Sequence, residues 1–443
     1  MTRILRATLL AGVITALAIA GWLPAHTRPV SGLGVVLITL DTTRVDRLSP
    51  YGFVDISLPH LERLAREGVV FHQATSVAPL TLPAHTTLLT GLLPPHHGVR
   101  DNADPPLRES HTTLAEVLRT GGFRTGAFVG STVLDPDRGL RQGFERYDGV
   151  DSSSHRSPYP RQRRADRVVT DAIRWLDTIA GSRFFLWTHL YDPHRPYDPP
   201  EPYATLYAHS PYLGEIAFAD SQIGRLMEAL ERRDILNRTI LIVAGDHGES
   251  LGDRGERDHG IFIYENVLRV PLIIRAPGVA PIRIGEVVRL TDVMPTILDL
   301  LAVSGPRTDG VSLVDVVRGR RRELDLEAYA ESRYPVRLGC SPLRALRDRR
   351  YKLIDAPDPE LYDLERDPFE LHDIHADRPA VARAMRARAA RVADSGGFAR
   401  ERVMPADLHA RLAALGYVAV AAADTPPRGT HRDPRDCIKA WPQ

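Results

Sequence analysis

The chain has 443 residues, of which 43% are hydrophobic and 26% charged, and its formal net charge is +1 at pH 7. These values are ordinary for a globular protein and exclude a collagen, a mostly disordered chain and a polytopic membrane protein. The near-neutral charge argues against nucleic acid as a partner. Only Lys352 and Lys439 are lysines, which leaves little room for a catalytic lysine, and the cysteines Cys340 and Cys437 can form one bridge.

The N-terminus has the layout of a targeting segment. Arg3 and Arg6 precede an uncharged, largely apolar run over residues 7–27, which contains the small residues Ala18 and Ala20. This layout is typical of a cleaved secretory signal peptide. The alternative is an uncleaved membrane anchor, because a spanning helix needs about 20 apolar residues. We expect residues 1–30 to be one of the two, and the remaining chain to be secreted or periplasmic.

Strands and helices then alternate along the chain. Continuous apolar runs predict buried strands, and apolar residues at helical spacing predict helices. The predicted strands are residues 34–40, 68–71, 124–129, 184–189, 239–244 and 270–275. The predicted helices are residues 58–66, 112–120, 165–180, 214–231 and 292–301. The alternation predicts an α/β fold with a mainly parallel central sheet flanked by helices, in which ligands bind beyond the carboxyl ends of the strands.

The pattern changes after residue 305. Residues 327–331, 343–347 and 351–354 read as short antiparallel strands, and residues 380–392 and 408–415 as helices. Residues 422–443, rich in Pro, Arg and Asp, are predicted to be a loose tail. We therefore expect a catalytic domain over 31–305, a small α+β subdomain over 306–395, and a helix with a loose tail over 396–443.

Two strand ends carry candidate metal ligands. Asp41 follows the first predicted strand, and Asp246 and His247 follow the strand at 239–244. Carboxylates bind hard cations, and an Asp-His pair between glycines is typical of a metal-binding turn. The small glycines would let a cation approach the backbone. An alternative role for Asp41 is a helix N-cap. The acidic residues beyond the turn are expected to lie in a solvated loop: Glu249, Asp253 and Glu256.

Two further segments offer a hydroxyl and a histidine. Thr81 precedes Pro83, which fits the first turn of a helix. An anion bound ahead of that helix meets free N–H groups and the positive end of the helix dipole. A threonine needs a metal or a base to become a nucleophile, and its alternative role is the N-cap. His194 lies between prolines as a candidate general acid or base, or as an incidental histidine in a surface loop.

Together these segments resemble the sulfatase family of the alkaline phosphatase superfamily, over about residues 34–375. No segment is specific alone, but their order along the chain is. The segments that carry the resemblance are residues 36–44, 90–102, 193–197, 245–249, 264–274, 292–296, 309–313 and 361–368. The resemblance implies an alkaline-phosphatase-like fold and an ester hydrolase.

The resemblance also implies roles for single residues. Asp41, Asp246 and His247 align with ligands of one divalent cation, for which this donor set permits magnesium, calcium, manganese or zinc. Thr81 aligns with the nucleophile, which in the family also contacts the metal.

The remaining implied roles concern the substrate. His85 takes the place of an arginine that follows the nucleophile by four residues. His194 matches the histidine that protonates the leaving group, and His259 falls near a second active-site lysine. Asn102 is a candidate contact for the bound anion.

The sequence departs from the family at the nucleophile. The family motif is Cys-x-Pro-x-Arg, with a serine in place of the cysteine in some members, and this first residue matures to formylglycine. Here the corresponding segment is Thr81-Leu82-Pro83-Ala84-His85. Threonine cannot become formylglycine, so none is expected. Thr42 stands where a second aspartate ligand is usual, and Ser131 where a lysine is usual. The motif does occur at residues 340–344, but in the C-terminal subdomain, where we do not expect modification.

Three functions remain open. The first is a metal-dependent hydrolase with Thr81 as its nucleophile. It would cleave a sulfate ester, or a phosphate or phosphonate ester, for example as a phosphodiesterase. Its substrate would be a small anionic ester or a sulfated or phosphorylated glycan or lipid. The second is a transferase of phosphoryl groups in the cell envelope. The third is a non-catalytic protein that binds anions.

Overall fold

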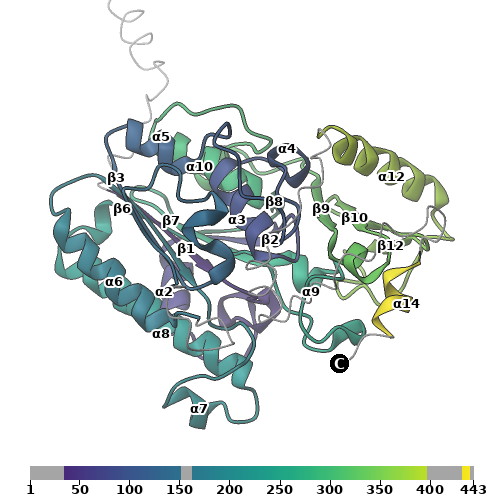
Figure 1. The fold of residues 1–443 in the computed structure, drawn as a ribbon, viewed down its shortest axis with the longest axis horizontal. Coiled ribbons are helices and arrows are strands. Elements are labelled where there is room, and N and C mark those ends of the chain that lie inside the picture. The colour runs from purple at the N-terminus through teal and green to yellow at the C-terminus, as the bar shows by residue number, and fades with distance from the viewer. Residues whose placement is uncertain (1–33, 151–161, 397–431, 440–443) are drawn as a thin grey trace, which may run out of the picture.

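The computed structural model describes residues 34–150, 162–396 and 432–439 (Figure 1). The predicted signal peptide or anchor at 1–30 and the predicted helix at 408–415 lie outside these residues. Among the described helices, none is both long and apolar enough to cross a membrane.

A central sheet of eight strands forms the core of the molecule. Its strands are β1 (Gly34–Leu40), β2 (Val69–Thr75), β3 (Arg124–Val129), β4 (Arg146–Asp148), β5 (Phe184–Leu190), β6 (Thr239–Gly245), β7 (Arg269–Arg275) and β8 (Ile282–Arg289). Their order across the sheet is β4-β3-β5-β1-β6-β7-β2-β8. The sheet is mainly parallel, as predicted, but β7 runs antiparallel to both of its neighbours, β6 and β2.

Helices cover both faces of this sheet (Figure 1). The α-helices of the described residues are α2 (Pro59–Glu67), α3 (Thr81–Thr90), α4 (Pro94–His97), α5 (Leu114–Thr120), α6 (Ala165–Thr178), α7 (Tyr203–Leu206), α8 (Pro211–Arg232), α9 (Glu265–Leu268), α10 (Val293–Leu300), α11 (Val314–Val317), α12 (Pro379–Asp394) and α14 (Pro434–Ile438). α2, α6 and α8 cover one face, and α3, α5 and α10 the other.

Strand β1 shows why both faces are covered. Its side chains alternate between the faces: Val35 and Leu37 join the core under α3, α5 and α10, while Val36 and Ile38 join the core under α2, α6 and α8. A strand that is apolar at both odd and even positions must be buried on both faces, which is the usual condition of a parallel strand.

A second, smaller sheet lies beside the first. Its strands are β9 (Ala328–Ser332), β10 (Leu343–Arg347), β11 (Tyr351–Asp355) and β12 (Glu360–Asp363), all antiparallel. Helix α12 packs on this sheet through Ala382, Met385 and Ala389, which lie at helical spacing on one side of the helix (Figure 1). This is the antiparallel C-terminal region that the short strands of the sequence predict.

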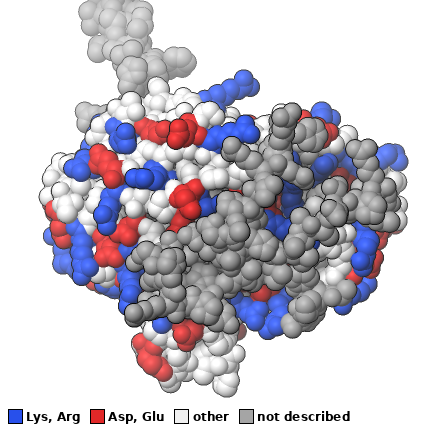
Figure 2. Space-filling model, in the orientation of Figure 1, with Lys and Arg blue, Asp and Glu red and all other residues white. Residues whose placement is uncertain are grey.

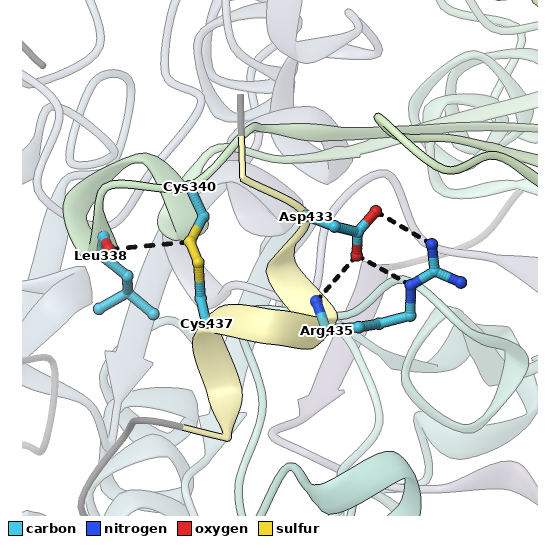
Figure 3. The surroundings of a disulfide bond; sticks show 5 residues. All are labelled: Leu338, Cys340, Asp433, Arg435 and Cys437. Atoms are coloured by element: carbon cyan, nitrogen blue, oxygen red, sulfur yellow. Dashed lines mark hydrogen bonds and ion pairs between the residues drawn. A yellow bond between two sulfur atoms is a disulfide. The ribbon is translucent and has the colours of Figure 1, made fainter. Parts of the chain in front are cut away.

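The predicted loose tail is wrong for residues 432–439, because α14 is anchored at several points. Cys437 forms a disulfide with Cys340 (Figure 3). The carboxylate of Asp433 accepts a hydrogen bond from the backbone N–H of Arg435, and the Arg435 guanidinium lies 2.8 Å from Glu360 of β12. A composition rich in Pro, Arg and Asp indicates weak local structure, but a covalent bond and ion pairs hold this segment on the small sheet.

Candidate active site

Two buried carboxylates meet at the carboxyl ends of neighbouring strands. β1 and β6 pair in parallel with Leu40 opposite Gly245, so the next residues, Asp41 and Asp246, lie side by side. Neither is exposed to solvent. Both oxygens of Asp41 and one oxygen of Asp246 have no hydrogen-bond partner among the described residues. Asp41 is therefore not a helix N-cap, because a cap would spend an oxygen on a backbone N–H.

His247 completes a donor set that fits a divalent cation. Its Nδ1 lies 2.9 Å from the carbonyl oxygen of Gly248 and must donate to it, which leaves a lone pair on Nε2. Nε2 faces Asp41 at 3.7 Å and Asp246 at 3.6 Å. One ligand atom of each of the three side chains lies within 4.8 Å of the others. A metal-binding histidine usually donates its second N–H to such a carbonyl, and unpartnered carboxylate oxygens require a positive charge.

The electrostatics of the three side chains support the same interpretation. Burial raises the pKa of Asp246 well above its usual value, and the nearby Asp41 raises it further. Burial also raises the pKa of Asp41, against the pull of three neighbouring histidines. Burial lowers the pKa of His247 well below its usual value. Without added positive charge the two carboxylates repel each other in a dry site, which a bound cation would reverse.

Gly248 has a packing role that the sequence did not predict, beside the predicted one of letting a cation approach the backbone. A Cβ atom at this position would lie 2.1 Å from the carbonyl oxygen of Asn266 in α9. The backbone N–H of Gly248 donates to the carbonyl oxygen of Val267 at 2.8 Å. The glycine thus allows the loop after β6 to pack closely on α9, which holds His247 in place.

Thr81 is the first residue of α3, which begins directly at the site. Its backbone follows the extended N-cap residue Leu80, so Thr81 is not the cap itself. The side chain is fully buried, and its Oγ1 lies 3.4 Å from Nε2 of His247. The hydroxyl therefore lies beside the three candidate metal ligands, as the family resemblance implies.

The first turn of α3 offers fewer N–H groups to an anion than predicted. The N–H of Leu82 already donates to Oδ1 of Asn102 at 2.9 Å, and Pro83 has no N–H. The Nδ2 amide of Asn102 is buried and has no partner among the described residues. Asn102 thus takes up one helix N–H and offers its own donor instead, which agrees with a role in anion binding.

His85 lies one turn further along α3, below the carboxylates. Its Nδ1 donates to the carbonyl oxygen of Thr81 at 2.7 Å, and its Nε2 lies 2.9 Å from Oγ1 of Thr39. Burial, helped by the nearby His189, lowers the pKa of His85 to about 3. Both ring nitrogens are engaged by the protein, so His85 supports the floor of the site and does not supply the charge of the arginine that it replaces.

Sequence reasoning missed the rest of this floor. The hydroxyl of Thr39 also accepts a hydrogen bond from Nε1 of Trp187 at 3.0 Å and lies 3.2 Å from Nδ1 of His189. Nε2 of His189 lies 3.3 Å from Asp41. Thr39 and His189 stand inside buried strands, where their neighbours are apolar, and nothing in the sequence distinguishes them from core residues.

His194 is buried rather than exposed on a surface loop. Its Nδ1 lies 2.7 Å from the carbonyl oxygen of Arg195 and 2.6 Å from the hydroxyl of Tyr191. Burial lowers its pKa to about 4, although Asp41 raises it in part. Its ring centroid lies 5.1 Å from that of His259, so the two candidate proton donors are neighbours.

The prediction of a solvated loop after His247 is wrong for two of its three acidic residues. Glu249 and Glu256 are buried, while the side chain of Asp253 is about half exposed. Oε1 of Glu249 lies 3.1 Å from Nδ1 of His259, whose ring packs 4.5 Å from that of His247. Burial alone would lower the pKa of His259, but the Glu249 carboxylate raises it to about 9.

The positions that depart from the family are also buried. Thr42 has a positive φ of 46°, and its hydroxyl has no partner among the described residues. Ser131 is buried after β3. Cys340 is held in the disulfide, which leaves no thiol for modification at the second Cys-x-Pro-x-Arg segment.

Known proteins resemble this chain over most of its length. The family model "Sulfatase" matches residues 34–303, and the model "N-sulphoglucosamine sulphohydrolase, C-terminal" matches residues 252–393. A choline-sulfatase of Rhizobium meliloti is 28% identical over 77% of this chain and 82% of its own length. An arylsulfatase of Clostridium perfringens is 26% identical over 77% of this chain and 89% of its own.

Solved structures show the same fold. The crystal structure of a phosphonate monoester hydrolase of Agrobacterium radiobacter superposes with a TM-score of 0.70, covering 82% of this chain and 95% of that one at 23% identity. The family models and the curated relatives define the chain as an ester hydrolase. Since the family model spans more than half of the sequence, the chain belongs to the sulfatase family.

Proposed function

We propose that this protein hydrolyses sulfate esters or phosphate-type esters with Thr81 as the nucleophile. The observation that carries the proposal is the position of Thr81. The residue begins helix α3. Its buried Oγ1 lies 3.4 Å from Nε2 of His247, beside two carboxylates that have unpartnered oxygens. A hydroxyl in such a place serves no evident structural purpose, since it caps no helix.

Asp41, Asp246 and His247 would hold a divalent cation, with Thr81 as a further oxygen ligand. When bound there, the cation supplies positive charge that polarises the anion and lowers the pKa of the threonine hydroxyl. The chain's own residues orient the reaction. Asn102 presents its buried amide to the anion, and α3 points its N-terminus at it.

The reaction has two steps. In the first, the hydroxyl of Thr81 gives its proton to water as its Oγ1 forms a bond to the sulfur or phosphorus atom; the bond to the leaving oxygen breaks, and His194 or His259 gives that oxygen a proton. In the second, a water molecule forms a bond to the same sulfur or phosphorus atom and gives one proton to that histidine. The bond to Oγ1 of Thr81 breaks, Oγ1 takes a proton from solvent, and the anion is released. A phosphoryl-threonine releases its group to water more readily than a sulfated threonine, so the threonine favours phosphodiesters and phosphonate esters within the proposed range.

The relatives bear on the substrate class. Their names include a choline-sulfatase and an arylsulfatase, and a solved structure of the same fold is a phosphonate monoester hydrolase. They support a small anionic ester, or a sulfated or phosphorylated glycan or lipid, as substrate. The apolar run at residues 7–27 supports export of the enzyme to the periplasm or the cell exterior.

The test is a panel of four esters with the purified protein. Aryl sulfate, phosphate monoester, phosphodiester and phosphonate monoester are each assayed with chelator, and after addition of magnesium, calcium, manganese or zinc. We expect cleavage that the chelator abolishes and that one of the cations restores. Thr81→Ala should lower kcat at least about 10³-fold, because a covalent step is lost, while Thr81→Ser should keep most of the activity.

The controls separate nucleophile from scaffold. Thr81→Ala should keep the melting temperature of the wild type within a few degrees, since one buried hydroxyl is removed. An adduct on the Thr81 peptide, detected by mass spectrometry after rapid quenching, would support the covalent step. Equal kcat in wild type and Thr81→Ala would rule out the nucleophile. Wild-type turnover only in the presence of an acceptor alcohol would instead indicate a transferase.

A further inference from the structure

We propose that Glu249, supported by Tyr197, is a positioning residue that holds the imidazole of His259 as the proton donor to the leaving oxygen. The inference rests on the proposed function and decides a point that it leaves open, the choice between His194 and His259. Sequence reasoning assigns Glu249 to a solvated loop, and the structure contradicts that assignment.

Glu249 links two loops of the site through its carboxylate. The side chain is fully buried. One oxygen lies 3.1 Å from Nδ1 of His259, and the other accepts a hydrogen bond from the hydroxyl of Tyr197 at 3.1 Å. Tyr197 belongs to the loop after β5 and packs its ring 5.4 Å from that of Tyr212 in α8. The position of the His259 ring is therefore fixed from outside its own loop.

A buried carboxylate is costly unless a positive group compensates it. Among the described residues, no arginine or lysine forms an ion pair with the Glu249 carboxylate, whose ionic partner is His259; Arg44 contacts only the backbone carbonyl of Glu249, at 3.3 Å. A carboxylate that accepts from Nδ1 fixes the proton on that nitrogen and stabilises the positive charge that the ring carries when it holds a second proton, on Nε2. The pairing thus prepares His259 to give a proton.

Within the described part of the chain, no carboxylate forms an ion pair with the His194 ring. Its Nδ1 lies against the carbonyl oxygen of Arg195 and the hydroxyl of Tyr191, both neutral groups. A carbonyl fixes the orientation of a ring but does not offset its charge. The two neighbouring histidines are therefore differently equipped, and the carboxylate assigns the donor role to His259.

The experiment measures how kcat depends on the leaving group. A series of aryl esters, of whichever anion class the wild type cleaves fastest, runs from 4-nitrophenol to phenol as leaving group. Glu249→Gln keeps the shape of the side chain but loses its charge. We expect kcat to fall about 10-fold with 4-nitrophenol and about 10³-fold with phenol, because a poor leaving group depends most on proton transfer. Tyr197→Phe should also lower kcat more with phenol than with 4-nitrophenol, but by smaller factors than Glu249→Gln.

Glu256→Gln is the matched control. Glu256 is a buried carboxylate of the same loop that accepts from the backbone N–H of Ile261 and from the hydroxyl of Ser250, both neutral groups. Its substitution should leave the leaving-group dependence unchanged. The proposal would be overturned if Glu249→Gln lowered kcat by the same factor with every leaving group. It would also be overturned if His194→Gln, and not Glu249→Gln, made kcat depend more steeply on the leaving group.

A spectroscopic readout separates this inference from the proposed function. The imidazole ¹⁵N shifts of His259 should show a protonated Nδ1 in the wild type and should change in Glu249→Gln but not in Glu256→Gln. Unchanged shifts in Glu249→Gln would overturn the proposal whether or not the protein turns over an ester. Absence of turnover with every ester, by contrast, would contradict the proposed function while the shifts still decide the pairing.

Discussion

The positions of Asp41, Asp246 and His247 are explained together by a cation that all three would bind. Asp41 and Asp246 are fully buried side by side, and His247 turns a lone pair toward both. Two buried carboxylates are unfavourable neighbours, and each unpartnered oxygen adds to the cost. A bound cation would offset this cost. The resemblance to the family implies that His85, Ser131 and His259 stand where an arginine and two lysines are usual, which would leave fewer fixed positive charges beside the carboxylates.

The substitution Asp246→Asn should stabilise the cation-free protein and remove the stabilisation that added cation gives. Because its folded-state pKa is raised, ionised Asp246 costs stability at neutral pH in the cation-free protein. Asp246→Asn should therefore melt higher than the wild type in chelator, measured by calorimetry at pH 7.5. Cation at about 100 times its Kd should stabilise the wild type by about 2.7 kcal/mol, and this gain should be lost in the variant.

Asp253→Asn serves as the comparison for Asp246→Asn. Asp253 lies in the same loop, but its side chain is about half exposed and it pairs with Arg44. This variant should retain the gain on adding cation. A cation-induced rise that persists in Asp246→Asn would contradict the assigned ligand set.

At the scale of elements, buried carboxylates also hold the loop that carries His194. Asp192 accepts a hydrogen bond from the N–H of Ala165, at the start of α6, at 2.8 Å. Glu215, in the first turns of α8, accepts from the N–H of Asp198 at 2.9 Å. The loop from Asp192 to Asp198 is thus fastened at both ends to the helices beneath it.

The Glu215 contact predicts a loss of stability at alkaline pH. Burial, helped by the nearby Asp192, raises the pKa of Glu215 from 4.5 to about 9. The folded protein therefore binds the proton more tightly than the unfolded chain, and this stabilisation is lost as the pH rises toward 9. Denaturant unfolding at pH 6 and pH 9 should show a fall of a few kcal/mol, since each pKa unit is worth about 1.4 kcal/mol.

Glu215→Gln should flatten that fall, because glutamine still accepts the Asp198 N–H and carries no proton to lose. Glu201→Gln, an exposed substitution in the same region, should follow the wild type at both pH values. If the fall between pH 6 and pH 9 were the same in Glu215→Gln as in wild type, Glu215 would not be its source.

At the scale of the whole molecule, the disulfide joins distant parts of the chain. Cys340 and Cys437 are 97 residues apart in sequence, and the bridge holds α14 against the small sheet (Figure 3). Cys340 follows the 3₁₀ turn η8 (Tyr334–Leu338), where Arg337 pairs with Asp101 beside Asn102. The bridge therefore fastens a segment that reaches the candidate site. On the face shown in Figure 2, acidic and basic side chains are interspersed among the described residues.

Removal of the disulfide should cost considerable stability. Cys437→Ser frees a loop of 97 residues, and the loss of a bridge of this kind typically costs about 2–5 kcal/mol. The free energy of unfolding in denaturant, with and without reductant, measures it. Reductant should destabilise the wild type to the level of the variant and leave the variant unchanged. A wild type that is unaffected although its thiols titrate as free would contradict the prediction.

Much of the fold could be predicted because its signals are local. The apolar runs that become β1 and β6 are continuous, so strand and burial follow from a few adjacent residues. The direction of β7 could not be predicted, because an apolar run reads the same in a parallel and an antiparallel strand. β8 alternates polar and apolar residues only in part, and was missed for that reason.

The sequence by itself determined the class of the protein and the place of its candidate site. Asp41, Thr81, Asp246 and His247 each follow or begin a predictable element, and parallel strands bring their ends to one edge. Only the tertiary structure decided which other polar residues join them. Glu249 is buried because Tyr197, from a loop some 50 positions earlier, closes over it. Burial of a polar group depends on such distant partners, which a local pattern cannot contain.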